Sequence, residues 1–304
     1  PDYAVTGVQT CALPISSHTV EARMARREIK RQLYQALALL TGLSFPWGSL
    51  TGIRPTQVAA EALRMSGQPV ASRRELIETW FVSPEKADLA VETAIAENRL
   101  LAFLSGGTAM VYVGIPFCPS RCAYCSFIAQ DAHLKDKLQA PYVEAVLSET
   151  EQLLAGLPQH LKISSVYFGG GTPTSLPERL FERLLTGVLT RLPLAGGVEL
   201  TVEAGRPDTI NSENLAIIRN AGVKRICINP QTFHDATLDR IGRRHTVEQT
   251  VEACRMAEKM GFDSINMDLI AGLPGEMPAD FYQSLRKALD RKSTRLNSSH
   301  GIIS

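Results

Sequence analysis

Three cysteines within eight positions have the residue type and the spacing for iron–sulfur chemistry. Cys118, Cys122 and Cys125 form a C-x3-C-x2-C pattern just after the apolar run VYVGIP. Three thiolates on one short loop suit a [4Fe–4S] cube, whose irons are bound by cysteine sulfur, and they leave one iron free for a chelating substrate. A structural zinc site usually has four ligands, and the next cysteines, Cys227 and Cys254, lie about a hundred residues further along the chain. The pattern therefore predicts a cluster site, with buried free cysteines or a zinc knuckle as the alternatives. We expect Cys227 and Cys254 to be small core residues.

Polar and glycine positions follow other apolar runs of the sequence. A glycine run at 169–171 ends SSVYFGG and precedes Thr172. Glycines there let bare backbone approach a ligand closely, although a tight turn alone would also need them. Glu203 ends the run VELTVE and could accept hydrogen bonds from a ligand ammonium or hydroxyl. Asp268 lies inside NMDLIAG, where a charge is costly unless it is paired or faces a ligand. These positions are therefore candidates for binding.

The apolar runs that carry these residues alternate with helical patterns. The strand-like runs are VYVGIP (111–116), SSVYFGG (164–170), VELTVEA (198–204), RICINPQ (225–231) and SINMDLIAG (264–272), with helical patterns near 141–154, 177–190, 212–220 and 247–260. Alternation of buried strands with helices predicts a parallel sheet. Five such units fit a partial (β/α)6 barrel better than a doubly wound sheet, and the polar residues lie at the downstream strand ends, where such barrels place their sites.

The region before this alternation predicts a small helical domain. Helical patterns cover residues 18–40, 55–65, 72–80 and 84–100. In the first of these, apolar positions share one face (Ile29, Leu33, Ala36, Leu37 and Leu40) and basic residues lie opposite (Arg23, Arg26, Arg27 and Arg31). We interpret the basic residues as a solvated helix face, with an anion-binding patch as the alternative. The sequence thus predicts an α/β protein with a helical N-terminal domain at 17–107 and a barrel core at 108–290.

Both ends of the chain look foreign to this pattern. Residues 1–16 and 291–304 have no periodicity that a core could use, and both resemble sequencing-adapter sequence translated at the ends of assembled gene fragments. We expect them to be non-native tails, with native disordered tails as the alternative. The core would then be truncated at its C-terminus, and Cys11 would have no role.

The composition is that of an ordinary globular protein. Of 304 residues, 44% are hydrophobic and 21% are charged, and the net charge of +1 gives no reason to expect a nucleic-acid partner. No apolar run is long enough to span a membrane, and no secretory signal opens the chain. Crowded cysteines in such a chain suggest thiolates kept reduced, and we expect a cytoplasmic protein.

At this point the sequence resembles a known family. VYVGIPFCPSRCAYCSF is similar to the cluster loop of oxygen-independent coproporphyrinogen III oxidases and their radical S-adenosylmethionine (SAM) relatives. From about Arg27 to Asp290, the chain resembles the HemZ-type coproporphyrinogen dehydrogenases. The motifs that carry this match are PWGSLTGIRPT (46–56), FGGGTPTSL (168–176), TVEAGRPDTI (201–210), NPQTFHDATLDRIGRRHT (229–246) and NMDLIAGLPGE (266–276).

The resemblance implies a set of ligand contacts. The triad would bind a [4Fe–4S] cluster, and one or two SAM molecules would contact Tyr112, Tyr124, Gly170, Gly171, Thr172, Glu203, Gln231, Arg243 and Asp268. Tyr124, Gln231, Arg243 and Asp268 match positions beside the second SAM. The alternatives are a solvated helix face for Arg243, an ordinary strand aromatic for Tyr112 and loop packing for Tyr124.

The resemblance also implies an activity. The cluster would cleave SAM reductively to methionine and a 5′-deoxyadenosyl radical, and an unidentified electron donor would supply the electron. The implied reaction of this oxidoreductase is the oxidative decarboxylation of coproporphyrinogen III to protoporphyrinogen IX, in haem biosynthesis. Phe127 stands where the oxidase has a further cysteine, so this substrate rests on the family resemblance more than on residues. The alternative is a haem chaperone of the HemW type, although about a hundred residues precede the triad here and those relatives begin close to it. We expect a chain cut before the last barrel elements to bind a cluster and to catalyse nothing.

Overall fold

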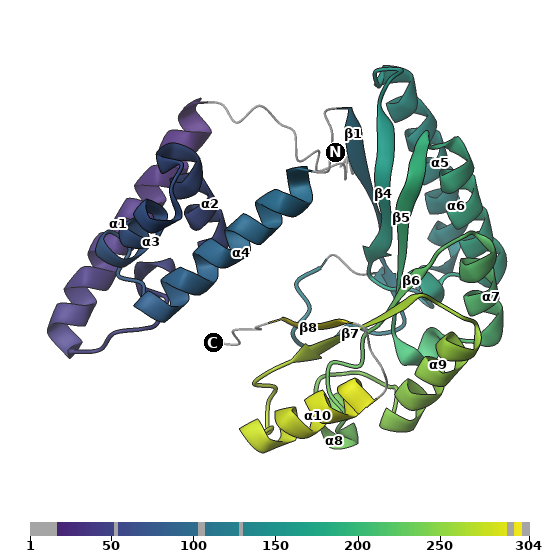
Figure 1. Ribbon diagram of the computed structural model, residues 1–304. Coiled ribbons are helices and arrows are strands. Elements are labelled where there is room, and N and C mark those ends of the chain that lie inside the picture. Colours follow the sequence, from purple (N-terminus) through teal and green to yellow (C-terminus); the bar gives the residue numbers. More distant parts are fainter. Residues whose placement is uncertain (1–16, 52–53, 103–106, 128–129, 291–294, 300–304) are drawn as a thin grey trace, which may run out of the picture. The chain divides into compact units, whose positions relative to one another are not determined.

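The computed structural model describes residues 17–51, 54–102, 107–127, 130–290 and 295–299. The chain divides into two compact units, residues 1–105 and 106–304 (Figure 1). Within the described residues, the first unit is helical and the second is built on a parallel sheet. Residues 1–16, 291–294 and 300–304, which belong to the predicted tails, lie outside the described residues.

The first unit is a group of helices around a small apolar core. Its elements are α1 (Ser17–Thr41), the 3-10 turn η1 (Gly48–Leu50), α2 (Pro55–Ser66), α3 (Pro69–Glu78) and α4 (Pro84–Ala102). Three of the helices begin at proline, whose fixed φ suits the first helical position. Gly67 ends α2 with a φ of 67°, a left-handed conformation that glycine adopts easily. Leu50, Leu76 and Trp80 are buried together at the centre of the unit.

The prediction of which face of helix α1 is exposed to solvent was wrong. Arg27 was expected on a solvated face, but it is only 5% exposed and pairs with Glu61 of α2. Conversely, Ile29, Leu33 and Leu37 of the predicted apolar face are exposed. The sequence pattern identified the helix correctly, but its contact with α2 includes the buried Arg27, whereas Ile29, Leu33 and Leu37 are exposed.

The second unit is a parallel sheet of six strands. They are β1 (Thr108–Ile115), β4 (Lys162–Gly170), β5 (Leu194–Gly205), β6 (Arg225–Ile228), β7 (Ser264–Ile270) and β8 (Arg295–Ser299). Their order in the sheet is the order along the chain, and every neighbouring pair is parallel. A separate two-stranded ladder joins β2 (Phe117–Cys118) to β3 (Gln130–Asp131).

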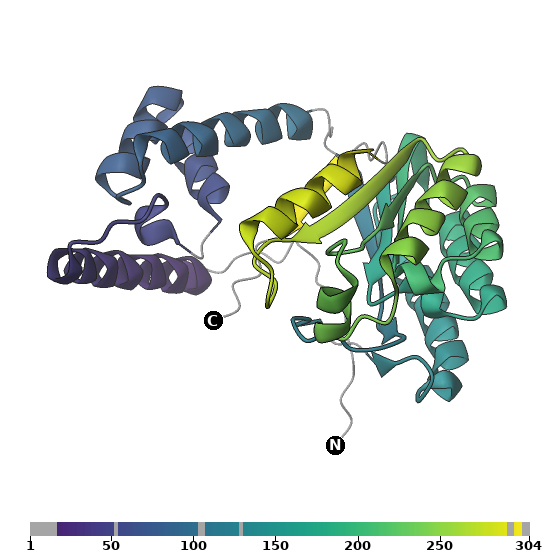
Figure 2. The same cartoon turned by 90° about the horizontal axis from the view of Figure 1, so that it is seen from below.

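Helices connect consecutive strands of the sheet. They are α5 (Asp136–Gly156), α6 (Glu178–Arg191), α7 (Ser212–Asn220), α8 (Asp235–Arg240), α9 (Val247–Lys259) and α10 (Pro278–Asp290), with 3-10 turns η2 (Pro173–Ser175) and η3 (Pro207–Thr209). Figures 1 and 2 show α5, α6, α7 and α9 along one face of the curved sheet. Strand–helix repeats of this kind confirm the predicted α/β class with a partial (β/α)6 arrangement and a helical N-terminal region.

The two faces of the sheet differ in chemistry because side chains alternate along a strand. Val113, Phe168, Val202 and Ile226 belong to the large core shared with the helices. The intervening positions carry polar or ionisable side chains (Tyr112, Tyr167, Glu203, Cys227, Asn266 and Asp268). The face away from the main core is therefore the one that can bind a polar ligand.

Strand β8 lies inside the stretch 291–304 that the sequence predicts to be non-native, and it pairs with β7 from Asn266 to Ile270. The origin of that stretch stays a prediction. Within the described residues, no helix is both long enough and apolar enough to cross a bilayer.

Candidate functional site

The segment from Cys118 to Cys125, called here the cysteine loop, begins at the two-stranded ladder of β2 and β3. Cys118 ends β2 and lies opposite Asp131, and the amide of Ala132 donates to the Cys118 carbonyl at 2.8 Å. Cys122 and Cys125 follow in the loop, where the Cys125 amide donates to the Cys122 carbonyl at 3.1 Å. Cys122 is buried, and the other two cysteines of the loop are half-buried. All three thiols therefore belong to one short segment, which backbone hydrogen bonds hold in place.

The donor set fits a cube better than a single ion. Burial raises the pKa of the Cys118 thiol, and electrostatic repulsion from the neighbouring Cys122 and Cys125 sulfurs adds to the rise. The Cys118 sulfur is therefore close enough to the other two to interact with them. Among the described residues, no three such side chains are close enough to surround one metal ion. Three sulfurs on one zinc, at about 2.3 Å each, must nearly touch, whereas a [4Fe–4S] cube takes each thiolate on a different iron and spreads them apart.

The glycine run packs directly against the cysteine loop. A side-chain carbon on Gly171 would lie 2.9 Å from Cys118 Sγ and 2.5 Å from the Phe117 carbonyl oxygen, and Gly170 has a φ of 105°. The amides of Gly171 and Thr172 donate to the carbonyls of Ile115 and Phe117, at 2.6 and 2.7 Å. Thr172 is buried, with its hydroxyl 3.5 Å from Cys118 Sγ. A side chain at Gly171 would therefore collide with Phe117 and Cys118, where the cysteine loop begins.

A carboxylate and two tyrosines meet on the polar face of the sheet. Glu203 accepts a hydrogen bond from the Asn229 side chain at 2.9 Å and from the Tyr167 hydroxyl at 3.4 Å. Burial, together with the Asp268 charge, raises the pKa of Glu203 to about 7. Tyr112 is 59% exposed and stacks on Tyr167 at 5.8 Å between ring centroids. Tyr167 was not among the predicted contacts, although its place between Val166 and Phe168 in a strand marked it as facing the polar side.

The last four predicted residues form two contacting pairs, Tyr124 with Arg243 and Gln231 with Asp268. Arg243 is 8% exposed, donates to the Tyr124 hydroxyl at 3.1 Å and also donates to the Asn229 carbonyl. The alternative of a solvated face for Arg243 is therefore wrong. Gln231 is buried with a φ of 70°, and its side-chain oxygen has no hydrogen-bond partner. Its backbone pairs with β7 through the Asp268 carbonyl at 2.9 Å.

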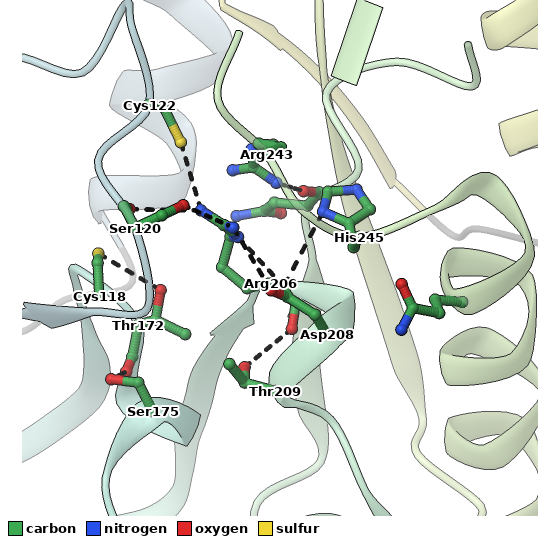
Figure 3. Close-up of polar contacts among 12 residues, drawn as sticks. Cys118, Ser120, Cys122, Thr172, Ser175, Arg206, Asp208, Thr209, Arg243 and His245 are labelled. Atoms are coloured by element: carbon green, nitrogen blue, oxygen red, sulfur yellow. Dashed lines mark hydrogen bonds and ion pairs between the residues drawn. The ribbon is translucent and has the colours of Figure 1, made fainter. Parts of the chain in front are cut away.

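Arg206 is a site residue that the sequence interpretation missed. Its guanidinium donates to Cys122 Sγ at 3.5 Å, to the Ser120 hydroxyl at 3.0 Å and to the Asp208 carboxylate at 3.2 Å (Figure 3). His245 is also close to Asp208, with Nδ1 4.0 Å from the carboxylate. The motif GRPDT contains both charges at the end of a strand, and that was the signal available in the sequence.

The chain is similar in sequence and in fold to several known proteins. A family model described as the radical SAM superfamily matches residues 112–288. A solved structure of coproporphyrinogen III oxidase (HemN) from Escherichia coli, described as a radical SAM enzyme, aligns with a TM-score of 0.57 and 26% identity, over 64% of this chain and 44% of that one.

Curated relatives of two kinds match the sequence. The oxygen-independent coproporphyrinogen-III oxidase-like protein HemZ of Bacillus subtilis is 36% identical over 92% of this chain and 58% of its own length. The haem chaperone HemW of Escherichia coli is 34% identical over 62% of this chain and 49% of its own length. The chain thus spans about half the length of the curated relatives that it matches.

Proposed function

This chain belongs to the radical SAM superfamily, whose members use a [4Fe–4S] cluster and SAM, and from that premise we propose that it is the core of an oxidoreductase acting on a porphyrinogen. Cys118, Cys122 and Cys125 would bind the cluster. The observation that carries the proposal is the tied cysteine loop beside the polar end of the sheet, where Thr172 and Glu203 lie.

The chain's own residues would bind and orient SAM. The cluster and SAM together supply one-electron cleavage of SAM to methionine and a 5′-deoxyadenosyl radical that removes hydrogen from the substrate. Glu203 would accept hydrogen bonds from the ligand ammonium, and a cation there would favour the ionised carboxylate. Tyr112 would cover the ligand from β1, where its ring is exposed and already stacked on Tyr167.

The remaining predicted contacts form a second group. Tyr124 comes from the cysteine loop, Gln231 and Asp268 come from the ends of β6 and β7, and Arg243 comes from the segment between α8 and α9. The unpaired side-chain oxygen of Gln231 suits a ligand donor. A buried polar atom without a partner costs free energy that a ligand would recover. We propose these four residues as contacts of a second SAM.

The substrate proposal is coproporphyrinogen III, whose two propionates would be decarboxylated oxidatively to give protoporphyrinogen IX. A separate donor would supply the electron that cleaves each SAM. Each propionate would lose one hydrogen atom to the 5′-deoxyadenosyl radical, and then CO2 and one electron, which an electron acceptor would take. The support for this substrate is the named activity of the HemN structure and the oxidase-like name of the HemZ relative. Phe127 in place of the oxidase's further cysteine leaves the triad intact.

A haem chaperone is the second candidate because HemW relatives match at 34% identity. That similarity covers 62% of this chain, whereas the similarity to HemZ covers 92%. The additional coverage favours the oxidase-like function.

The test uses the full-length gene product, reconstituted anaerobically. We expect bound iron and sulfide, cleavage of SAM and consumption of coproporphyrinogen III, and we expect C118A, C122A and C125A each to lose the cluster. C254A is the matched control, because Cys254 is buried in the core away from the loop and should leave the iron content unchanged. Stoichiometric retention of haem without turnover would instead support the chaperone, and wild-type protein without iron would overturn both.

A further inference from the structure

The environment of Cys122 differs from that of the other two thiols. Cys122 is the buried member of the triad, and the Arg206 guanidinium donates to its sulfur at 3.5 Å. The Thr172 hydroxyl lies 3.5 Å from Cys118 Sγ, and Cys125 is half-buried in the loop. One corner of the site is therefore in contact with a cation.

Arg206 reaches this sulfur from another part of the chain. It lies directly after Gly205, whose φ of 66° turns the chain at the end of β5. From there the guanidinium bridges the loop, because it also donates to the Ser120 hydroxyl at 3.0 Å and to the Ser120 carbonyl at 3.5 Å. Figure 3 shows the side chain pointing into the cysteine loop from the sheet.

The charge of Arg206 is buried and balanced. The residue is 2% exposed, so water does not screen it. A buried charge needs a partner, and Asp208 supplies two contacts, at 3.2 Å to Nε and 3.4 Å to Nη2. His245 lies against the other side of Asp208, and its own burial with the neighbouring Arg243 charge lowers the pKa of His245 to about 4, so it adds no charge at neutral pH.

We propose that Arg206 is a positioning residue that fixes Cys122 and raises the reduction potential of the cluster, and that Asp208 sets how strongly it does so. The inference rests on the proposed binding of a cluster by the triad. Hydrogen bonds to cluster sulfurs and nearby net charge are the protein's means of tuning the potential. A donor with a positive charge stabilises the extra electron of the reduced cluster. The carboxylate of Asp208 offsets part of that effect.

The proposal predicts opposite shifts for two neighbouring variants. The full-length protein is reconstituted anaerobically without SAM, and the midpoint potential is measured by a redox titration followed by electron paramagnetic resonance. R206Q should lower the ratio of reduced to oxidised cluster about tenfold at a fixed solution potential, which is about 59 mV for one electron. D208N keeps an acceptor for the guanidinium but removes the negative charge, so it should raise the ratio. R179Q, at an exposed arginine of α6, is the charge-matched control and should leave it unchanged.

Each outcome decides the question. A role limited to holding the loop would lower the cluster content without moving the two potentials in opposite directions. Unchanged potentials in R206Q and D208N, or shifts of the same sign, would overturn the inference alone. If R206Q retains no cluster, D208N decides by itself, and a potential at or below that of the wild type rejects the proposal. If wild-type protein holds no cluster, the proposed function fails and this inference fails with it.

Discussion

The Glu203 side chain on β5 is mostly buried, and it accepts hydrogen bonds from Tyr167 and Asn229. Burial and, to a smaller extent, the Asp268 charge raise the pKa of its carboxyl from an ordinary value of 4.5 to about 7. The folded protein therefore holds a proton between about pH 4.5 and pH 7 that the unfolded chain has lost. The free energy of unfolding should fall as the pH rises through this range and then level off.

The variant E203Q tests this dependence in the protein without ligand. It should be more stable than wild type at pH 8, by on the order of 2 kcal/mol, and close to wild type at pH 4.5. The measurement is urea unfolding at several pH values. E182Q, at an exposed carboxylate of α6, serves as the control. Parallel pH profiles for wild type and E203Q would contradict the assigned pKa.

For single residues, the sequence predicts sites formed by neighbours in the chain, but it does not predict contacts between residues far apart in the chain. The triad lies within eight positions, so its spacing alone predicts a shared site. Arg206 contacts Cys122 across 84 positions, so the GRPDT motif shows a charged pair at a strand end but not the sulfur that it meets. Arg243 contacts Tyr124 across 119 positions, and only the family resemblance predicted it as a site residue. The same limit explains Arg27, whose partner Glu61 lies on another helix.

At the scale of elements, the turn after β4 and the cysteine loop depend on each other. G171A should lower both the stability and the cluster content, because its side-chain carbon would lie 2.5 Å from the Phe117 carbonyl and 2.9 Å from Cys118 Sγ. Overpacking of this kind costs about 1–3 kcal/mol. The measurements are thermal unfolding and iron content. In G196A the new carbon has open space, so both quantities should match wild type. Full iron content in G171A would show that the loop can shift without loss.

Helix α9 begins with a capping box, in which the Thr246 hydroxyl accepts from the Gln249 amide and the Gln249 side chain accepts from the Thr246 amide. T246A should reduce the free energy of unfolding by about 1 kcal/mol in chemical denaturation. T190A changes an exposed threonine within α6, where alanine is a better helix former, and should cause no loss. Equal losses in both variants would assign the effect to something other than the cap.

The elements themselves follow from the sequence more closely than their ends do. Apolar runs separated by helical patterns give the parallel order β1-β4-β5-β6-β7, because right-handed crossovers place consecutive strands side by side. The short ladder of β2 and β3 was not predicted, since two-residue strands carry no periodicity. Strand β8 was not predicted either, because its residues have no alternating pattern.

At the scale of the whole molecule, the two units have separate cores. Leu76 is fully buried in the helical unit beside Leu50 and Trp80, and none of these residues belongs to the core of the sheet. L76A should destabilise the helical unit by about 2–5 kcal/mol and leave the iron content of the full-length protein unchanged. Hydrogen exchange read by mass spectrometry over residues 55–102 measures the first effect. L89A, at an exposed position of α4, is the control. Faster exchange in the sheet as well would show that the two units unfold together.

The ladder between Phe117–Cys118 and Gln130–Asp131 also determines where the polypeptide tolerates added length. Because the triad depends on its C-x3-C-x2-C spacing, extra residues between Cys118 and Cys125 would change the distances between the sulfurs. By contrast, Gly196 and Gly197 lie at an irregular stretch of β5, exposed and with open space around them. An affinity tag or a fluorescent label for following this protein therefore belongs at the second location.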